Sequence, residues 1–514
     1  MSAQELFSIL PLLLISAGIV VLLLQVSFWR NHAGALVTTL ITLVAAIIAC
    51  FWVGASLSGN NGSIQVTALL SIDYNSLFFC LLILVTAIAV SVMGYNYLKL
   101  RCDLNRNPDS YPEEFYILLL LAILGASTLV FASHFATFFL GIELISLALY
   151  PLLGFAVTGN LSSSKDQVNS LESAFKYLIL SALSTALGLF GIALIYAASG
   201  ALDFGSIATR IQDLSQTSAL FATGATLLVI SVAFKLSLVP FHIWTPDVFQ
   251  GAPTPTTALI ATVGKTAVIA FLLRFFNTLN LYQSPILIDL LTIAAIASML
   301  IGNLLALMQN NIKRLLAYSS IGHIGYLIVA FIIGNSAFGT EAVIYYMVAY
   351  VITTLGAFAI VGLIADSVEA AQLTNGTNVS DVTDSADDPY HRDFYRGLLW
   401  RSPWLASCLA LMLLSLAGIP LTIGFIGKFY VFTAGVEGKM WALLAGVVIG
   451  SALGLFYYLR LLLTMVQRDA IDTSSNSETL QITTSGQFLI ATLAAVLVFF
   501  GIFPQVLINW INAI

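Results

Sequence analysis

Apolar runs long enough to cross a bilayer recur along the whole chain of 514 residues, and they constrain its fold more than any other feature. A membrane-spanning helix needs about 20 consecutive apolar residues. The sequence predicts fourteen such spans, near residues 6–28, 33–54, 74–97, 114–132, 134–157, 172–197, 219–248, 255–277, 286–308, 312–334, 338–365, 404–435, 441–466 and 486–510. The expected fold class is therefore an all-α polytopic membrane protein.

The composition excludes soluble protein classes, because 59% of the residues are hydrophobic and only 9% are charged. A soluble domain has about 25% charged residues. The four cysteines are scattered without CxxC or Cys/His spacing, and no Gly-rich phosphate loop follows a strand. We therefore expect no metal, redox centre, nucleotide or nucleic acid to bind this chain. The first apolar run has no Lys or Arg before it, which favours a retained span over a signal peptide.

The distribution of basic residues predicts the orientation. With fourteen spans, thirteen Lys and Arg residues lie on the side opposite the termini, three lie on the terminal side, and three lie inside spans. Loops rich in Lys and Arg stay in the cytoplasm. Both termini should therefore be non-cytoplasmic. The polar insert 366–397, "DSVEAAQLTNGTNVSDVTDSADDPYHRDFYRG", should be a flexible cytoplasmic loop.

Ionisable side chains inside the spans are the candidate functional residues, because they are costly at that depth and usually serve function. They are Glu143, Lys235, Lys265, His323 and Lys428. A lysine that reaches back to the interface would lie near a span end, but Lys235 and Lys265 lie well inside theirs. Glu143 is the mid-span carboxylate, so we expect it to be an ion-pair partner for a buried lysine.

The histidines leave alternatives open. His323 lies in "LAYSSIGHIGYLIVAF", where small and hydroxyl residues leave room for water, and it fits either packing or proton transfer. His242 follows Pro240 and fits either a cap for an interrupted helix or a relay member. His134 lies in an interfacial hairpin and is expected to be structural.

Two long spans, the seventh and the twelfth, contain an internal proline near a lysine. Lys235 precedes Pro240, whereas Lys428 follows Pro420. Helix breaks at membrane depth are tolerated where the freed backbone lines a cavity or is buried in protein. Interrupted helices at matching positions of an inverted repeat point to a transport pathway. A lysine holds its proton less tightly when desolvated and more tightly beside a carboxylate, which is the chemistry a proton relay needs.

This pattern predicts four segments. Residues 1–110 form an N-terminal three-helix segment, and residues 111–280 form a first inverted repeat of helices 4–8. Residues 281–470 form a second repeat of helices 9–13, with a cytoplasmic loop at 366–400, and residues 471–514 form helix 14.

Three motifs carry a family resemblance: "VPFHIWTPDVFQGAPTPTTALIATVGKTA", "RLLAYSSIGHIGYLIVA" and "GIPLTIGFIGKFYVF". The chain resembles, over essentially its whole length, the antiporter-like membrane subunits of respiratory complex I. It is most similar to the NuoN branch, called NdhB in cyanobacteria and chloroplasts. The resemblance implies two inverted five-helix repeats with broken helices 7 and 12. It also implies proton-relay roles for Glu143, Lys235, Lys265 and Lys428. Lysine in "FIGKF" favours NuoN over NuoM, and no lateral helix of the NuoL type is expected.

The resemblance further implies a non-redox, proton-translocating subunit of an NAD(P)H- or ferredoxin-driven quinone oxidoreductase. This chain would carry no cofactor, while iron–sulfur clusters, quinone and flavin would belong to partner subunits. The expected partners are other membrane-arm subunits and lipids. The acidic insert and the following "HRDFYRGLLWRSP" favour the photosynthetic branch. That branch implies plastoquinone, a thylakoid membrane and lumenal termini; a bacterial inner membrane is the alternative.

Two other functions compete with this interpretation. One is an Mrp-type sodium/proton antiporter subunit, but sodium would need clustered carboxylates or carbonyl oxygens. One mid-span glutamate against three lysines favours protons. The other is a structural membrane spacer, for which three buried lysines would serve no purpose.

Overall fold

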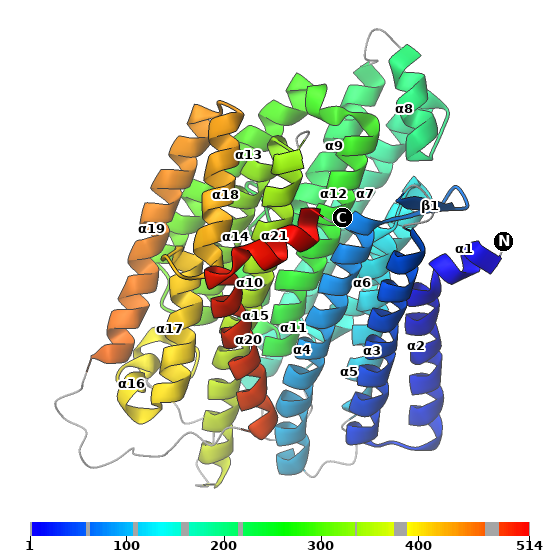
Figure 1. Ribbon diagram of the computed structural model, residues 1–514. Coiled ribbons are helices and arrows are strands. Elements are labelled where there is room, and N and C mark those ends of the chain that lie inside the picture. Colours follow the sequence, from blue (N-terminus) through cyan, green and yellow to red (C-terminus); the bar gives the residue numbers. More distant parts are fainter. Residues whose placement is uncertain are drawn as a thin grey trace.

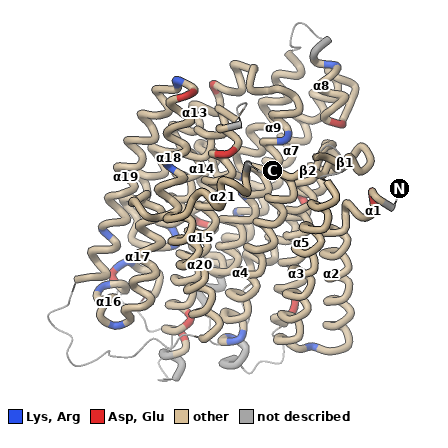
Figure 2. Tube along the Cα trace, in the orientation of Figure 1, with Lys and Arg blue, Asp and Glu red and all other residues tan. Residues whose placement is uncertain are grey.

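The computed structural model is a bundle of long helices that run side by side (Figure 1), as the sequence predicts. It describes residues 3–57, 62–105, 111–155, 164–213, 219–334, 337–374, 388–467 and 483–512. Within these ranges, thirteen helices are long and apolar enough to cross a membrane. Most charged residues lie near the two ends of the bundle (Figure 2). The predicted fold class, a polytopic helical membrane protein, is confirmed.

Eleven spans are single helices: α2 (Leu10–Phe28), α3 (His32–Leu57), α4 (Tyr74–Asn105), α5 (Glu113–Val130), α6 (Phe135–Leu153), α7 (Ser164–Ser199), α13 (Pro285–Leu307), α14 (Ile312–Ile332), α15 (Ala337–Thr374), α19 (Trp441–Val466) and α20 (Thr484–Ile502). Two of the other three predicted spans are broken, as α9 (Ala219–Leu236) with α10 (Trp244–Gly251) and α17 (Pro403–Ala417) with α18 (Ile423–Glu437). The third is one continuous helix that contains α11 (Thr254–Leu259), the π-helical segment η1 (Ile260–Gly264) and α12 (Lys265–Leu279). Helices 7 and 12 are thus broken, as expected.

In the first helical hairpin of each proposed repeat, the two helices approach closely at a glycine. In α5–α6, a Cβ on Gly125 would lie 2.8 Å from the backbone nitrogen of Ile145. In α13–α14, a Cβ on Gly302 would lie 2.8 Å from the backbone nitrogen of Gly322. Small residues let membrane helices approach this closely. Because α7 and α9 also pack closely through Gly191 and Gly224, the division into two repeats stays a prediction.

Three segments differ from the expected loops and spans. The loop before α4 contains an antiparallel hairpin of β1 (Ser63–Val66) and β2 (Leu70–Asp73), and the loop after α7 contains helix α8 (Phe204–Asp213). The last span ends at Ile502, because Pro504 begins the separate helix α21 (Pro504–Asn512). Each of these elements is too short for its periodicity to stand out beside long apolar runs. The remaining short helices are α1 (Ala3–Ser8), η2 (Leu281–Gln283), η4 (Arg392–Tyr395) and α16 (Leu398–Arg401).

The predicted flexible loop 366–397 is only partly a loop. Its first residues continue α15 to Thr374, where ion pairs from Asp366 and Glu369 to Arg101 hold that helix against α4. Its last residues pack on the start of α14, since the Ile312 N–H donates to the Tyr390 carbonyl at 2.8 Å. Residues 375–387 lie outside the described residues.

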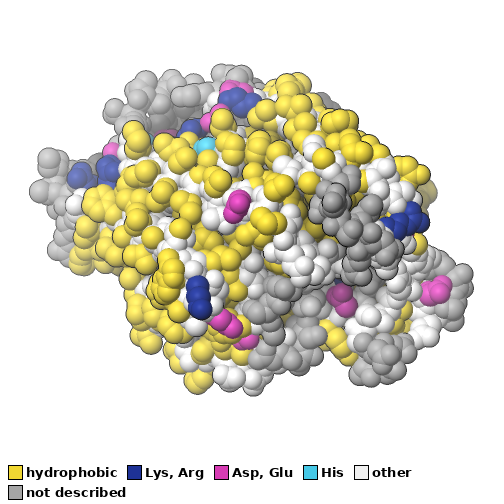
Figure 3. All heavy atoms as spheres, turned by 90° about the horizontal axis from the view of Figure 1, so that it is seen from above, with side chains coloured by type: hydrophobic (Ala, Val, Ile, Leu, Met, Phe, Trp, Pro, Cys, Tyr) yellow, Lys and Arg dark blue, Asp and Glu magenta, His cyan; other side chains and the backbone are white. Residues whose placement is uncertain are grey.

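The end of the bundle that carries α8 is viewed in Figure 3, where charged side chains are scattered over a largely apolar and neutral surface. Arg274, one of the three basic residues predicted for this side, pairs with Asp73 at 2.8 Å. α4, which carries Arg101 near its C-terminal end, reaches the opposite end of the bundle, where α16 also lies (Figure 1). The side of the membrane that each end faces stays a prediction.

Candidate proton-relay site

Lys235 lies at the break in helix 7. It is the penultimate residue of α9, which ends at Leu236, several residues before Pro240. The break therefore precedes the proline that was expected to cause it, because Ser237 leaves the helical backbone with a φ of +63°. The Phe234 carbonyl accepts the Ser237 N–H at 3.0 Å and Nε1 of Trp244 at 3.1 Å. Protein groups therefore satisfy the last backbone carbonyl of α9 that the break would leave open.

The Lys235 ammonium is held by hydroxyl groups from two neighbouring helices. It donates to Oγ of Ser146 on α6 and to Oγ of Ser181 on α7, each at 2.6 Å. Its Nζ also lies 5.4 Å from the ring centroid of Tyr177. Charge-assisted hydrogen bonds of this kind are worth about 1.5–3 kcal/mol each. They hold the lysine inside the bundle and away from both membrane surfaces.

Glu143 does not make the contact ion pair expected from the sequence. It lies on α6, one turn before Ser146, yet the ion pairs among the described residues join other partners. Its Oε1 atom is buried without a hydrogen-bond partner in the part of the chain that the structure describes. The serine hydroxyls have taken the place of a carboxylate beside Lys235. A buried carboxylate oxygen without a partner is costly unless it gains a proton or a donor.

A π-helical segment precedes Lys265. Residues of η1 end at Gly264, and the Lys265 N–H donates to the Thr262 carbonyl. In a regular α-helix it would donate to the Ala261 carbonyl. That carbonyl instead accepts a hydrogen bond from Oη of Tyr350 at 3.0 Å. Such π-segments are frequent at functional sites. The sequence analysis did not foresee this one, and the Gly264 next to the lysine was its only local signal.

The Lys265 ammonium begins a hydrogen-bonded chain. It is 1% exposed and donates to Oγ of Ser320 on α14. That hydroxyl shares a hydrogen bond with Oη of Tyr350 on α15 at 2.6 Å. The chain joins α12, α14 and α15: the ammonium donates, and the two hydroxyl groups can each donate and accept.

His323 contacts a hydroxyl group on each side of its ring. Nδ1 lies 2.7 Å from Oη of Tyr346 on α15, and Nε2 lies 3.3 Å from Oη of Tyr458 on α19. The Tyr458 hydroxyl is also hydrogen-bonded to Ser319. An imidazole with a partner on both nitrogens can accept a proton at one and release a proton from the other. The arrangement places His323 in a network and not in apolar packing alone.

The Lys428 ammonium is bound by a backbone carbonyl at the break in helix 12. Gly418 ends α17 with a φ of +84°, and the Ala417 carbonyl accepts a hydrogen bond from Nζ of Lys428 at 2.9 Å. The carboxyl end of a helix carries partial negative charge and favours a cation. Nζ also lies 5.2 Å from the ring centroid of Tyr326. The break therefore supplies the ammonium with its acceptor.

The two other histidines lie apart from these chains. His242 lies in the segment between α9 and α10, and its Nδ1 is buried without a partner among the described residues. His134 caps α6, since its Nδ1 accepts the Ala136 N–H at 3.0 Å. That cap gives His134 the structural role predicted for it.

Neutral hydroxyl and amide groups are what the sequence analysis missed. They carry no charge, so nothing marks them inside an apolar span. They are Ser146, Ser181, Tyr326, Tyr346, Tyr350, Tyr458 and Asn303, whose Nδ2 donates to Tyr326 at 3.0 Å. The hydroxyls of Ser319 and Ser320 belong to the set that the sequence analysis placed around His323.

A family described as NADH:quinone oxidoreductase/Mrp antiporter, TM, matches residues 132–454. This range contains every residue of the hydrogen-bonded chains above except Tyr458. The chain belongs to this family. The NADH-quinone oxidoreductase subunit N of Ectopseudomonas mendocina is 39% identical over 515 aligned residues, covering 99% of this chain and 97% of that protein. The predicted NuoN-type membership is confirmed.

Solved structures agree with this membership. A chain of respiratory complex I from Thermus thermophilus is 28% identical, with a TM-score of 0.76 and coverage of 97% of this chain and 98% of that one. A chain of the Mrp complex from a Dietzia species has a TM-score of 0.80 at 18% identity, covering 99% of this chain and 96% of that one. At that identity the likeness extends to the fold alone.

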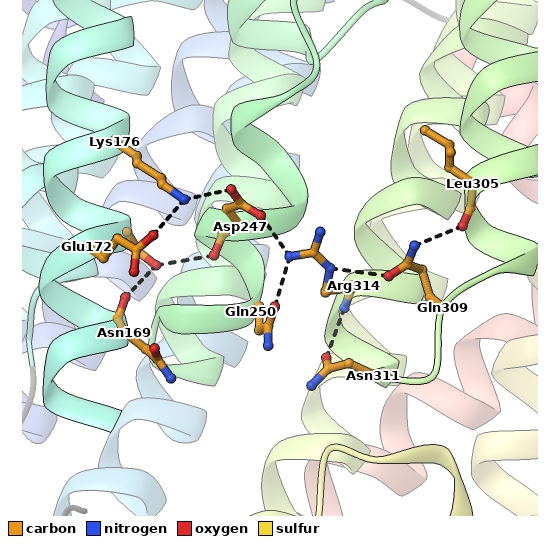
Figure 4. Close-up of polar contacts among 10 residues, drawn as sticks. Asn169, Glu172, Lys176, Asp247, Gln250, Leu305, Gln309, Asn311 and Arg314 are labelled. Atoms are coloured by element: carbon orange, nitrogen blue, oxygen red, sulfur yellow. Dashed lines mark hydrogen bonds and ion pairs between the residues drawn. The ribbon is translucent and has the colours of Figure 1, made fainter. Parts of the chain in front are cut away.

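A second polar cluster in this family member lies beside the break in helix 7 (Figure 4). Asp247 on α10 accepts from Lys176 on α7 at 2.8 Å and from Arg314 on α14 at 2.7 Å. Arg314 also donates to Gln250 at 2.9 Å, and Lys176 also pairs with Glu172 at 2.7 Å. The cluster ties the short half-helix α10 to one helix of each proposed repeat.

Proposed function

We propose that this chain is the proton-translocating subunit N of a complex I-type NAD(P)H- or ferredoxin-driven quinone oxidoreductase. Protons cross through Lys235, Lys265 and Lys428, with Glu143 modulating Lys235. His323 joins the relay through its two tyrosine partners. His242, which has no partner in these chains, stays a second candidate. Electron carriers and quinone belong to partner subunits of the same membrane arm, and this chain supplies no cofactor.

The observation that supports this proposal best is the setting of the three lysines. Each lies at a helix irregularity: Lys235 at the end of α9, Lys265 after a π-segment, and Lys428 beside the end of α17. Each ammonium is bonded to neutral oxygen atoms of serine or backbone. A buried ammonium that lacks a fixed counterion can release its proton at a cost that a carboxylate or a conformational change can tune. Permanently paired lysines would not titrate in this way.

The proposal is tested with Glu143→Gln and Lys235→Met, singly and together, in vesicles that contain the assembled complex. Protons translocated per quinone reduced are measured. Each single substitution should lower the ratio, and the double substitution should be less than additive because both act on one group. The control is Lys439→Met, the same change at an exposed lysine, which should leave the ratio unchanged. Normal ratios in both single variants would remove Glu143 and Lys235 from the pathway.

The Mrp-type alternative predicts sodium transport. Sodium binds clustered oxygen ligands, usually with carboxylates among them. The three lysines instead place positive charge along the interior of this chain, which opposes a bound cation. Sodium-dependent flux in proteoliposomes that contain the chain without redox partners would favour the alternative.

The narrower proposal is a photosynthetic complex that reduces plastoquinone in the thylakoid membrane, with both termini lumenal. It rests on the acidic insert 366–397 and the basic stretch that follows it. A bacterial inner membrane with another quinone is the alternative. Extraction of the quinone that copurifies with the complex distinguishes the two. Protease cleavage within the insert, restricted to one side of oriented vesicles, tests the orientation.

A further inference from the structure

Asn303 is a buried amide inside a membrane span, and the proposed relay does not use it. It lies on α13 and is 2% exposed. Its Nδ2 donates to Oη of Tyr326 on α14, and its Oδ1 accepts from Oη of Tyr457 on α19, each at 3.0 Å. Nδ2 also donates to the Met299 carbonyl at 2.6 Å. A buried amide is costly unless it is hydrogen-bonded, and this one is bonded through both its polar atoms.

Three glycines leave the space that this amide and its tyrosine partner occupy. A Cβ on Gly322 would lie 2.9 Å from Nδ2 of Asn303, and a Cβ on Gly454 would lie 3.3 Å from its Oδ1. A Cβ on Gly450 would lie 2.8 Å from Oη of Tyr326. Because these glycines belong to α14 and α19, both neighbouring helices close on the hydrogen bond between Asn303 and Tyr326. Packing therefore holds this pair in one arrangement.

The ring of Tyr326 contacts two residues of the proposed relay. Nζ of Lys428 lies 5.2 Å from the ring centroid. The ring of His323 meets it edge-on, with the two centroids 5.7 Å apart and an interplanar angle of 86°. The Tyr326 hydroxyl lies at Asn303 and also interacts with Ser451 on α19. The ring of Tyr326 is thus in the relay, whereas its hydroxyl is tied to helices outside it.

A fixed aromatic ring distinguishes the two protonation states of a neighbouring lysine. The face of the ring attracts a cation, and this attraction is lost when the amine becomes neutral. A ring that is free to turn adapts to either state. A ring tethered by its hydroxyl stays in place when the proton leaves, so the returning proton finds the same site.

We propose that Asn303 is a positioning residue of the relay, which holds the Tyr326 ring against the Lys428 ammonium and His323. The inference rests on the function proposed above. It adds a neutral residue from α13, a helix that carries none of the proposed relay side chains. Asn303 does not itself carry the proton; it acts through the hydroxyl of Tyr326.

The first test measures protons translocated per quinone reduced over a range of pH, in vesicles that contain the assembled complex. Asn303→Leu has a similar volume and removes the amide, so Tyr326 loses this tether. The alkaline limit of translocation should move to lower pH by ~0.5–1 unit, because the ammonium loses its contact with the ring. The matched control is Asn96→Leu. That buried amide on α4 bonds Ser485 on α20, and its loss should leave the profile unchanged.

Other titratable groups lie next to Lys428, directly or through His323, and they stay in place in Asn303→Leu. They are Tyr326 and His323 on α14, Tyr346 on α15 and Tyr458 on α19. α17 contributes the Ala417 carbonyl, and α20 carries no titratable residue. The variant changes none of these groups and releases only Tyr326, so a shifted profile reports the position of that ring.

A second set of variants disturbs the same hydrogen bond from other sides. Tyr326→Phe keeps the ring and removes the hydroxyl, so it should shift the profile in the same direction. Combined with Asn303→Leu it should add nothing, because both changes break one bond. Gly450→Ala presses on the Tyr326 hydroxyl from α19 and should also shift the profile. Gly446→Ala is its control, since a Cβ there meets the flexible end of Met299 at 2.8 Å.

Lys428→Met, measured alongside, separates the two proposals. Lost coupling in Lys428→Met with normal pH profiles in Asn303→Leu and Tyr326→Phe overturns the positioning role and leaves the relay standing. Normal coupling in Lys428→Met removes this lysine from the relay and the positioning role with it. Less complex but an unchanged profile in Asn303→Leu assigns the amide to helix packing alone and also overturns the inference. If Asn303→Leu does not assemble, the profiles of Tyr326→Phe and Gly450→Ala decide.

Discussion

Lys235 lies just before the break between α9 and α10, whereas Lys428 lies after the break between α17 and α18. Two serine hydroxyls from neighbouring helices hold the Lys235 ammonium. A backbone carbonyl at the break itself holds the Lys428 ammonium. A carboxylate, Glu143, lies one helical turn from one of those serines, while Lys428 has the ring of Tyr326 as its neighbour.

The two lysines therefore differ in whether their hydrogen-bond partners can pass a proton onward. A hydroxyl both donates and accepts, so a proton can pass from Lys235 through its serine partners. A carbonyl only accepts, so the Ala417 carbonyl positions Lys428 but cannot carry its proton onward. We therefore expect charge and hydroxyl chemistry to matter most at Lys235, and backbone geometry to matter most at Lys428.

The largest effect is expected from replacing each lysine by arginine. Arginine keeps its charge at any relevant pH, so Lys235→Arg and Lys428→Arg should assemble yet translocate protons at least about tenfold more slowly. The measurement is proton uptake per quinone reduced in membranes with equal amounts of complex. If Lys428→Arg alone keeps normal coupling, Lys428 is a structural charge and the two breaks differ in function as well as geometry.

A smaller effect is expected from Gly418→Ala. The position has a φ of +84°, which costs about 1–2 kcal/mol for a residue with a Cβ. The new Cβ would also lie 2.8 Å from Cδ of Lys428. The yield of assembled complex and its thermal stability should both fall. Gly264→Ala beside Lys265 is the control, since a Cβ there meets nothing within 4 Å. Equal losses in the two variants would show that the positive φ of Gly418 and its closeness to Lys428 are not what makes the break in helix 12 sensitive.

The smallest effect is expected from Asp247→Asn. It weakens two ion pairs whose side chains are 26–40% exposed, and such pairs are worth about 0.2–1 kcal/mol each. Thermal unfolding in detergent should shift slightly at low salt and not at high salt, where the charges are screened. Glu172→Gln, which affects only the pair with Lys176, should shift it less. A loss of coupling as large as that of the lysine variants would make Asp247 part of the relay.

The sequence by itself determined the spans, the two broken helices and the lysines near them. Each of these follows from neighbouring residues: an apolar run, a proline or glycine, and a charge that the run does not tolerate. The family resemblance then assigned Glu143, Lys235, Lys265 and Lys428 a role that their positions alone left open. The sequence did not predict the exact positions of the helix irregularities. α9 ends before Pro240, and Gly264 alone marks the π-segment before Lys265.

Only the tertiary structure decided which groups meet. Lys235 contacts serines 89 and 54 residues away, and Lys265 contacts Ser320, 55 residues away. These partners are neutral and common in spans, so no local pattern marks them. Their positions depend on the rotation and depth of each helix against its neighbours, which are set by packing over the whole bundle. For the same reason Glu143 interacts with Lys235 through charge and not through direct contact, because the packing places serine hydroxyls at the ammonium.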